Sequence, residues 1–335
     1  MNRPRTVLAM APDLPARLFV DEVRERLWAC AVIDPDLVLV EFGSPAARAV
    51  LADAEVLLTG WGCPTVDEVV LAVAPQLRAI VHAAGSVKGH LAPACWDRGI
   101  VVSTAADANA LPVAEYTLAM ILLAGKSTHL IERRYRQQRS AIDLHTDFPE
   151  IGNYRYTIGI VGASRIGRRV IDLLRPFDLE VVVSDPYLGQ SEACELGVGL
   201  ADLDDLLRAS HIVSLHAPSL PSTRHLIDRR RLGLMRDGAT LINTARGALI
   251  DQAALTEELV AGRINAILDV TEPWVLPPES PLYTLPNVVL TPHMAGALGV
   301  ELRRLGAYAV DELGRYAAGQ PFRSPVTRAD LDRMA

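Results

Sequence analysis

The sequence predicts an α/β protein built from two doubly wound parallel-sheet domains. Short apolar runs alternate with helical patterns along the chain, as in the β-α-β units of a parallel sheet. This alternation occurs in two series, separated by a long helical stretch and a polar loop at Ser140–Tyr156. With 335 residues, of which 50% are hydrophobic, the chain is long enough to bury two cores.

The first series contains four expected strands. Each is a short run of apolar or β-branched residues, the pattern of strands that are covered on both faces. We expect a helix from Ala16 to Trp28 after the first of them. The strands are Thr6–Met10, Val56–Thr59, Ala79–Ala83 and Val101–Ser103.

A stretch with few helix breakers follows, from Val113 to about Arg139. We expect one long helix there, suited to a bridge between domains or to a subunit contact. The second series then supplies six strands of a doubly wound sheet. They are Ile158–Val161, Glu180–Ser184, Ile212–Leu215, Thr240–Asn243, Asn265–Leu268 and Val288–Leu290.

The chain ends in an amphipathic helix whose apolar residues keep helical spacing. Because this helix follows a completed sheet, we expect it to pack back on the first domain. The expected domains are therefore 1–108, 109–297 and the returning segment 298–335. The spaced apolar residues are Leu302, Leu305, Ala309, Leu313 and Tyr316.

Composition and charge argue against several partners. The formal net charge is −7, and the richest basic run, Glu132–Arg139, alternates with polar residues, so no nucleic-acid surface is expected. No membrane span is expected either, because the apolar stretch Leu111–Gly125 carries Glu115. The scattered cysteines indicate no metal site and no disulfide framework, which favours a reduced, cytoplasmic protein. They are Cys30, Cys63, Cys95 and Cys194.

The segment Ile158–Gly167 (IGIVGASRIG) is typical of a strand, a glycine turn and a helix that together bind a dinucleotide pyrophosphate. Gly162, Ser164 and Gly167 occupy the three glycine positions of that turn, and Arg165 and Ile166 complete it. Serine at the middle position is small and able to donate to a phosphate oxygen. Taken alone, the motif also fits a plain strand-turn-helix.

Asp185 ends the next strand at the separation expected for the residue that binds the adenosine ribose hydroxyls. An acid there repels a ribose phosphate, so NAD is expected rather than NADP; the alternative is that Asp185 caps its own turn. The following strand ends in His216, Ala217 and Pro218. The protein backbone is expected to run along the adenosine half of the cofactor there. A lone histidine at such a place is more often structural than catalytic.

Three strand ends near the end of the chain carry an arginine, an acid and a histidine. They are LINTAR with Arg246, ILD with Asp269 and TPH with His293. Such a set is able to bind a carboxylate and to move a proton. Combined with a dinucleotide site upstream, it suggests hydride transfer.

At this point the chain resembles the D-isomer-specific 2-hydroxyacid dehydrogenases over nearly its whole length. The resemblance implies a Rossmann-type NAD domain inserted in a flavodoxin-like substrate domain, with a cleft that closes on the substrate. It also implies a homodimer and NAD-dependent interconversion of a 2-oxoacid and a D-2-hydroxyacid. The motifs that carry it are VGASRIG (161–167), SLHAPSLPSTRHLI (214–227), LINTARGALID (241–251), AILDVTEP (266–273) and NVVLTPHMAG (287–296).

By this resemblance, Arg246 grips the substrate carboxylate with a planar fork that lysine does not provide, and His293 is the acid-base group. Asp269 is implied to lie by the nicotinamide and to help hold its carboxamide. The cofactor contacts implied in addition are Thr223, Thr244 and Ala245.

The resemblance also implies a substrate loop in the first domain. Gly85, Ser86 and Val87 match a family loop whose backbone amides hold the substrate carboxylate. Lys88 follows and is similar to the phosphite dehydrogenase pattern, in which a lysine adds positive charge to an anion site; the alternative is a solvated lysine. Asn109 matches the crossing into the long helix.

One departure concerns the partner of the histidine. Family members carry a glutamate five residues after the strand-end acid, and Trp274 occupies that place here. Glu272 is a candidate catalytic replacement if the loop brings it to His293, and a solvent-facing glutamate is the alternative. Without an anion beside it, His293 is expected to have a lowered pKa.

The substrate stays open among glyoxylate, hydroxypyruvate and phenylpyruvate. A rival function is an NAD(H)-sensing binding protein on the same fold with little turnover, which the departures at Trp274 and Ser164 favour slightly. Oxidation of a small anion such as phosphite is another, and it depends on Lys88 alone. A Rossmann methyltransferase leaves the LINTARG motif unexplained.

Overall fold

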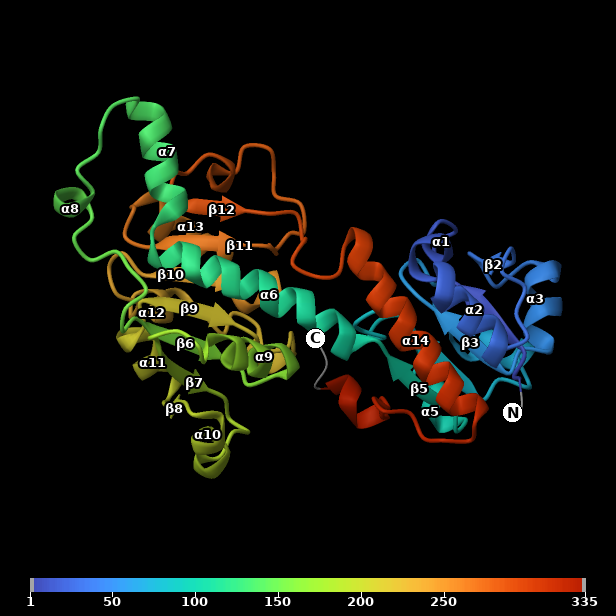
Figure 1. Cartoon of the computed structure of the whole chain (residues 1–335). Coiled ribbons are helices and arrows are strands. Elements are labelled where there is room, and N and C mark those ends of the chain that lie inside the picture. Colours follow the sequence, from blue (N-terminus) through green and yellow to red (C-terminus); the bar gives the residue numbers. More distant parts are fainter. Residues whose placement is uncertain (1–2, 333–335) are drawn as a thin grey trace. The chain divides into compact units, whose positions relative to one another are not determined.

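The computed structural model describes residues 3–332, and these residues form two compact units (Figure 1). One unit contains the described residues up to 110 together with those from 297 onward, and the other contains 111–296. The division lies two residues from the expected boundary after 108 and one residue from that after 297. Each unit has its own parallel sheet with helices on both faces, as the sequence predicts.

The first unit contains a five-stranded parallel sheet in the order β2-β1-β3-β4-β5. This order is that of flavodoxin-like folds, which confirms the prediction. One apolar core lies on the face covered by α3 and α4, and another lies on the face covered by α1, α2 and α14. The strands are β1 Thr6–Ala9, β2 Val38–Leu39, β3 Val56–Thr59, β4 Ala79–His82 and β5 Val101–Thr104. The helices are α1 Leu14–Leu18, α2 Asp21–Cys30, α3 Pro45–Ala52, α4 Glu68–Val73, α5 Ala94–Asp97 and α14 Leu302–Ala317.

The last helix, α14, packs on α1 and α2 of the first unit (Figure 1). Leu302, Leu305, Ala309 and Leu313 form its buried face. The described chain after residue 297 thus belongs to the first unit. The helix expected over 16–28 is instead two helices, α1 and α2, which are separated by Phe19 and Val20.

The second unit contains a seven-stranded parallel sheet in the order β12-β11-β10-β9-β6-β7-β8. The strand order reverses between β6 and β9, and in such sheets ligands bind outside the carboxyl ends of the strands at this switch point. The two-residue strand β8 escapes sequence analysis, which expects six strands. The strands are β6 Thr157–Val161, β7 Glu180–Ser184, β8 Gly199–Leu200, β9 Ile212–Leu215, β10 Thr240–Asn243, β11 Asn265–Leu268 and β12 Val288–Leu290.

Helices cover both faces of this sheet. On one face, Ile121 of α6 and Val170 of α9 pack against sheet residues such as Ile160. On the other, Leu206 of α11 and Leu255 of α13 belong to a second core. The helices are α6 Ala106–Gly125, α7 Thr128–Gln138, α8 Leu144–Asp147, α9 Arg165–Leu174, α10 Gln190–Leu196, α11 Leu203–Ala209, α12 Arg229–Leu232 and α13 Gln252–Val260. Short 3₁₀ helices are η1 Pro221–Thr223, η2 Gly247–Leu249, η3 Pro281–Tyr283, η4 Gly299–Glu301 and η5 Arg328–Asp332.

The single long helix expected over 113–139 is wrong in two respects. The helix begins earlier, at Ala106, and it breaks before α7, where Ser127 takes a left-handed conformation with φ of 47°.

By length and composition alone, α6 also meets the criterion for a membrane span, with a mean hydropathy of 1.3. This is weak evidence, because a core helix of a soluble protein meets the same criterion; Ala114 and Ile121 of α6 are buried in the second unit's core.

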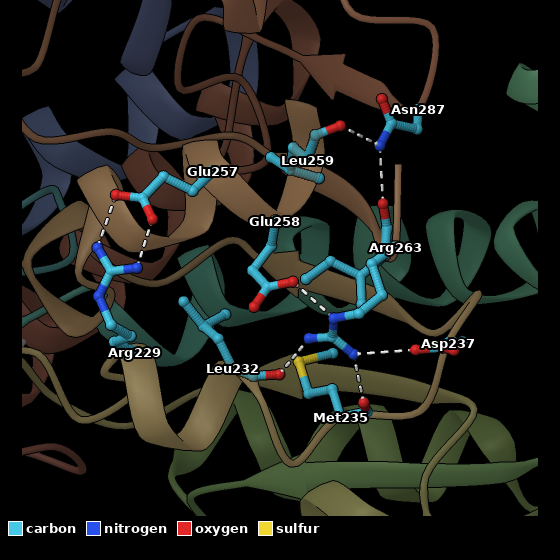
Figure 2. A network of polar contacts seen from close by, with 10 residues as sticks. Arg229, Leu232, Met235, Asp237, Glu257, Glu258, Leu259, Arg263 and Asn287 are labelled. Atoms are coloured by element: carbon cyan, nitrogen blue, oxygen red, sulfur yellow. Dashed lines mark hydrogen bonds and ion pairs between the residues drawn. The ribbon is translucent and has the colours of Figure 1, made fainter. Parts of the chain in front are cut away.

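Arg263, which follows α13, connects the loops that precede β10 and β11, at the amino-terminal ends of these strands (Figure 2). Arg263 donates to the carbonyl oxygens of Leu232, at 2.6 Å, and Met235, at 2.7 Å, and pairs with Glu258 at 2.6 Å. Arg229 of α12 forms a bidentate ion pair with Glu257 of α13. These contacts fix α12 and α13 against β11, at the opposite strand ends from the site described next.

Candidate functional site

The site begins at a glycine turn between β6 and α9. Gly162 has a φ of 98°, and a Cβ there would lie 2.8 Å from the backbone nitrogen of Ala217. A Cβ on Gly167 would lie 2.1 Å from the carbonyl oxygen of Gly162. Both glycines are therefore required by close packing: the turn lies against the end of β9, and the helix lies against the turn.

Ser164 is the N-cap of α9. Its Oγ accepts a hydrogen bond from the backbone N–H of Gly167 at 3.3 Å. Its φ of −67° needs no glycine, which explains how serine is tolerated at this position. As an acceptor in the cap, the hydroxyl keeps its proton for donation to an anion at the positive end of the helix.

Asp185 braces the glycine turn from the end of β7. One carboxylate oxygen accepts from Ala163 N and the other from Tyr187 N, each at 2.7 Å. The alternative of a turn cap is thus realised, but Asp185 also holds the glycine turn. Each oxygen retains an acceptor position for a ribose hydroxyl.

The side chains that follow β9 form hydrogen bonds within the protein. His216 is buried, with Nε2 2.9 Å from Ser214 Oγ, and burial lowers its pKa to about 4, so it is uncharged at neutral pH. The Thr223 hydroxyl donates to the carbonyl of Pro218 at 2.6 Å and closes this loop. Cofactor contacts at His216, Ala217, Pro218 and Thr223 stay predictions.

Asn243, at the end of β10, sets the direction of the chain before Arg246. Its side chain accepts from Ala245 N at 3.0 Å and donates to the Arg246 carbonyl at 2.9 Å. Thr244 is buried, with its hydroxyl 3.1 Å from that of Thr117 on α6. Sequence analysis missed Asn243 and Thr117, although the asparagine stands inside the LINTAR motif.

Arg246 is a half-buried cation without an acidic partner. Its guanidinium donates to the carbonyl of Ala245 at 2.7 Å, and no carboxylate among residues 3–332 pairs with it. Burial lowers its pKa, yet a guanidinium stays charged in proteins. A buried cation without an anion is costly, so this position favours an anionic ligand.

Asp269 organises the loop that carries His293. It is 1% exposed and accepts hydrogen bonds from Thr291 Oγ1 at 2.6 Å, Met294 N at 2.8 Å and Ala295 N at 2.9 Å. Its own carbonyl accepts from His293 N at 2.9 Å. Its observed role is thus to position the histidine loop, and its contact with a nicotinamide carboxamide stays a prediction.

His293 is half-buried and takes a left-handed conformation, with φ of 55°. Trp274 lies against it, with ring centroids 4.5 Å apart, and Nδ1 is buried without a hydrogen-bond partner among the described residues. Burial lowers the pKa of His293; Asp269 raises it and the charge of Arg246 lowers it further. His293 and Arg246 are therefore electrostatically coupled within one loop cluster.

The expectation that Glu272 replaces the family glutamate is wrong in this structure. Its carboxylate pairs with Arg224 at 2.9 Å and lies 3.9 Å from His225 Nε2. Its backbone N–H donates to Gln252 at 3.0 Å, which holds the loop in this arrangement. The permanent charge of Arg224 attracts the glutamate more effectively than an uncharged imidazole does.

The expected substrate loop follows β4 in the first unit. Val87 is buried, Gly85 and Ser86 are half-buried, and the backbone N–H of Lys88 donates to Ser86 Oγ at 3.3 Å. The Lys88 side chain is exposed. Asn109 accepts from Ala297 N at 3.0 Å and so joins the two segments of this unit. Substrate binding by these residues stays a prediction.

Comparison with known proteins agrees with this geometry. Residues 118–295 match the family described as D-isomer specific 2-hydroxyacid dehydrogenase, NAD binding domain. D-3-phosphoglycerate dehydrogenase of Mycobacterium bovis is 33% identical over 320 residues, which are 95% of this chain and 56% of that protein. The chain spans about half the length of the curated phosphoglycerate dehydrogenases that it matches.

Two solved structures are similar over nearly their full length. A phosphoglycerate oxidoreductase from Rhizobium etli has a TM-score of 0.81 at 25% identity, with 98% of this chain and 100% of that chain covered. D-Lactate dehydrogenase from Aquifex aeolicus, complexed with NAD and lactic acid, has a TM-score of 0.71 at 26% identity. That alignment covers 94% of this chain and 96% of the lactate dehydrogenase.

Proposed function

Because the chain belongs to the D-isomer-specific 2-hydroxyacid dehydrogenase family, we propose that it interconverts a 2-oxoacid and a D-2-hydroxyacid with NAD as cofactor. The observation that carries this proposal is Arg246. It is a half-buried guanidinium without a carboxylate partner among the described residues, in the same loop cluster as His293. A carboxylate-bearing substrate supplies the missing anion.

The residues around the glycine turn fit NAD. Gly162 lets the turn pack against the end of β9, where a Cβ would clash with Ala217, and the start of α9 presents backbone N–H groups that suit a pyrophosphate. Asp185 offers a carboxylate to ribose hydroxyls and repels a ribose phosphate. When bound, the cofactor supplies a hydride to the carbonyl carbon of the 2-oxoacid, or accepts one from the hydroxyacid.

In this mechanism Arg246 binds the substrate carboxylate through two parallel N–H donors and polarises the neighbouring carbonyl. The imidazolium of His293 donates a proton to the carbonyl oxygen in reduction. In oxidation, the neutral imidazole takes the hydroxyl proton. Asp269 keeps His293 in place through the loop contacts described above.

The surface beside His293 favours an apolar side chain on the substrate. Trp274 is 67% exposed and Met294 is 43% exposed, so both present apolar area next to the imidazole. A phosphorylated side chain gains nothing from such groups. We therefore propose a 2-oxoacid with an apolar or aromatic side chain rather than a phosphorylated one.

The test is NADH oxidation by the purified protein with glyoxylate, hydroxypyruvate, phenylpyruvate and 3-phosphohydroxypyruvate, with NADPH as the cofactor control. The proposal expects turnover with NADH and the highest kcat/KM for phenylpyruvate. Absence of turnover with every 2-oxoacid, despite NADH binding, would contradict it.

That outcome would favour an NAD(H)-sensing protein, for which the unpartnered Nδ1 of His293 is the supporting observation. The variant His293→Asn separates the two functions. An enzyme loses turnover and keeps NADH binding, whereas a sensor keeps its response to NADH. The homodimer and the cytoplasmic location also stay predictions.

A further inference from the structure

One buried histidine, His82, and one half-buried histidine, His90, lie at the base of the expected substrate loop. His82 is the last residue of β4 and is 2% exposed, and its Nδ1 lies 2.9 Å from the hydroxyl of Thr59, the last residue of β3. Its imidazole also hydrogen-bonds to the backbone of Ser86. That contact raises the pKa of His82, as a carbonyl acceptor does, while burial and His90 hold it well below 6.5.

The imidazole of His82 is therefore uncharged, and its two nitrogens have different partners. In the neutral tautomer that fits both contacts, Nδ1 accepts a hydrogen bond from the Thr59 hydroxyl and the N–H of the other nitrogen donates to the Ser86 carbonyl. Because Thr59 lies at the end of a central strand and is fully buried, it gives His82 a rigid support. The position of the Ser86 peptide is thereby tied to the sheet.

His90 closes the loop from its other end. Its ring lies against that of His82, with centroids 4.5 Å apart and 43° between the planes. The backbone N–H groups of His90 and Leu91 both donate to the Val87 carbonyl, at 3.3 and 3.2 Å. We call this pair of histidines in ring contact, His82 and His90, the histidine clasp.

We propose that the histidine clasp positions the loop Gly85–Lys88, so that its backbone amides present a fixed set of donors to the substrate carboxylate. His82 acts here as a positioning residue through Ser86. The inference rests on the proposed function, because it assumes that this loop binds a 2-oxoacid. A fixed loop binds the ground state and the transition state equally, so its loss raises KM more than it lowers kcat.

The first experiment compares His82→Ala with His82→Gln in steady-state turnover of the best 2-oxoacid. In His82→Ala we expect KM to rise about tenfold, the size of effect that the loss of one positioning hydrogen bond gives. We expect kcat and the Kd of NADH to change little. His82→Gln should recover most of the loss, because its amide is able to accept from Thr59 and donate to Ser86.

A matched control is His211→Ala. His211 is a structural histidine of the second unit, where it accepts from Thr157 N at 3.0 Å and stacks on Tyr156. This variant should lose stability without a change in KM. If His82→Ala fails to fold, Thr59→Val removes the support of His82 and should give the same rise in KM.

An unchanged KM in His82→Ala, or a rise that His82→Gln does not reverse, would overturn the inference in an active enzyme. Absence of turnover in the wild type would instead refute the proposed function. In that case amide hydrogen exchange tests whether the histidine clasp positions the loop. Faster exchange of amides 83–89 in His82→Ala, but not in His211→Ala, supports it, and equal exchange overturns it.

Discussion

The indole of Trp274 lies against the imidazole of His293, with ring centroids 4.5 Å apart and 35° between the ring planes. Trp274 stands where the family carries the glutamate that pairs with this histidine, and Glu272 is held elsewhere by Arg224. An aromatic face therefore replaces a charged acceptor. Nδ1 of His293 is left buried without a partner among the described residues, so the imidazolium is poorly stabilised.

The variant Trp274→Glu restores a carboxylate beside this imidazole. We expect the pKa of His293 to rise, because a neighbouring negative charge favours the protonated form. Reduction of the 2-oxoacid should then persist to correspondingly higher pH, as measured by kcat/KM across a pH series. Trp274→Phe is the control, since it keeps an aromatic ring and should leave the pH profile unshifted. An equal shift in both variants would contradict this account.

The wild-type pH profile follows from the lowered pKa of His293, for which burial is the main cause. Reduction needs the protonated imidazole, so its kcat/KM should fall as pH rises, with a midpoint below 6.5. Oxidation needs the neutral imidazole and should rise through the same midpoint. Both directions are measurable by NADH absorbance. A midpoint for reduction above 7 would show that His293 has an anionic partner in solution.

Cofactor preference depends on Asp185. In Asp185→Asn the charge is lost, while one amide oxygen still accepts from Ala163 or Tyr187. We expect the ratio of kcat/KM for NADPH to that for NADH to rise by about tenfold, because the repulsion of the ribose phosphate is removed. NADH binding should weaken at the same time. An unchanged ratio would mean that another group excludes NADP.

Stability in acid depends in part on His216. Its pKa in the native state is about 4, against 6.5 in the unfolded chain, so the unfolded state binds the extra proton between these values. The free energy of unfolding should therefore fall as pH is lowered from 6.5 to 4, with about 3 kcal/mol lost through this group.

Urea unfolding at several pH values measures this dependence. In His216→Gln the titrating group is absent and the contact with Ser214 is retained, so the loss over the same pH range should be smaller. Parallel curves for the wild type and the variant would show that His216 is not the group responsible.

Much of the fold follows from local patterns. Strands β3, β7, β9, β10, β11 and β12 have the bounds that the sequence predicts, because strands covered on both faces are continuous apolar runs. The edge strands β2 and β8 contain two residues each, too few for a pattern. Gly125 ends α6 two residues before Ser127, and a single glycine in an otherwise helical pattern was too weak a signal to predict the break.

The site was predictable where a motif carries it, and not where distant segments meet. Gly162, Arg246 and His293 follow from strand ends and spacing. The pairing of Glu272 with Arg224 joins residues 48 positions apart, and the Thr59–His82 contact joins residues 23 apart. No local sequence pattern predicts such partners, because only the folded sheet brings these side chains together.

The most direct test of the account is the role of Arg246 as the anchor of the substrate carboxylate. The measurement is kcat/KM for the best 2-oxoacid with NADH in Arg246→Met and Arg246→Lys, beside the Kd of NADH in each. We expect a fall of at least about 1000-fold in Arg246→Met and a smaller fall in Arg246→Lys, since lysine keeps the charge but not the planar fork. NADH binding should be unchanged in both. Turnover in Arg246→Met close to that of the wild type would contradict the account.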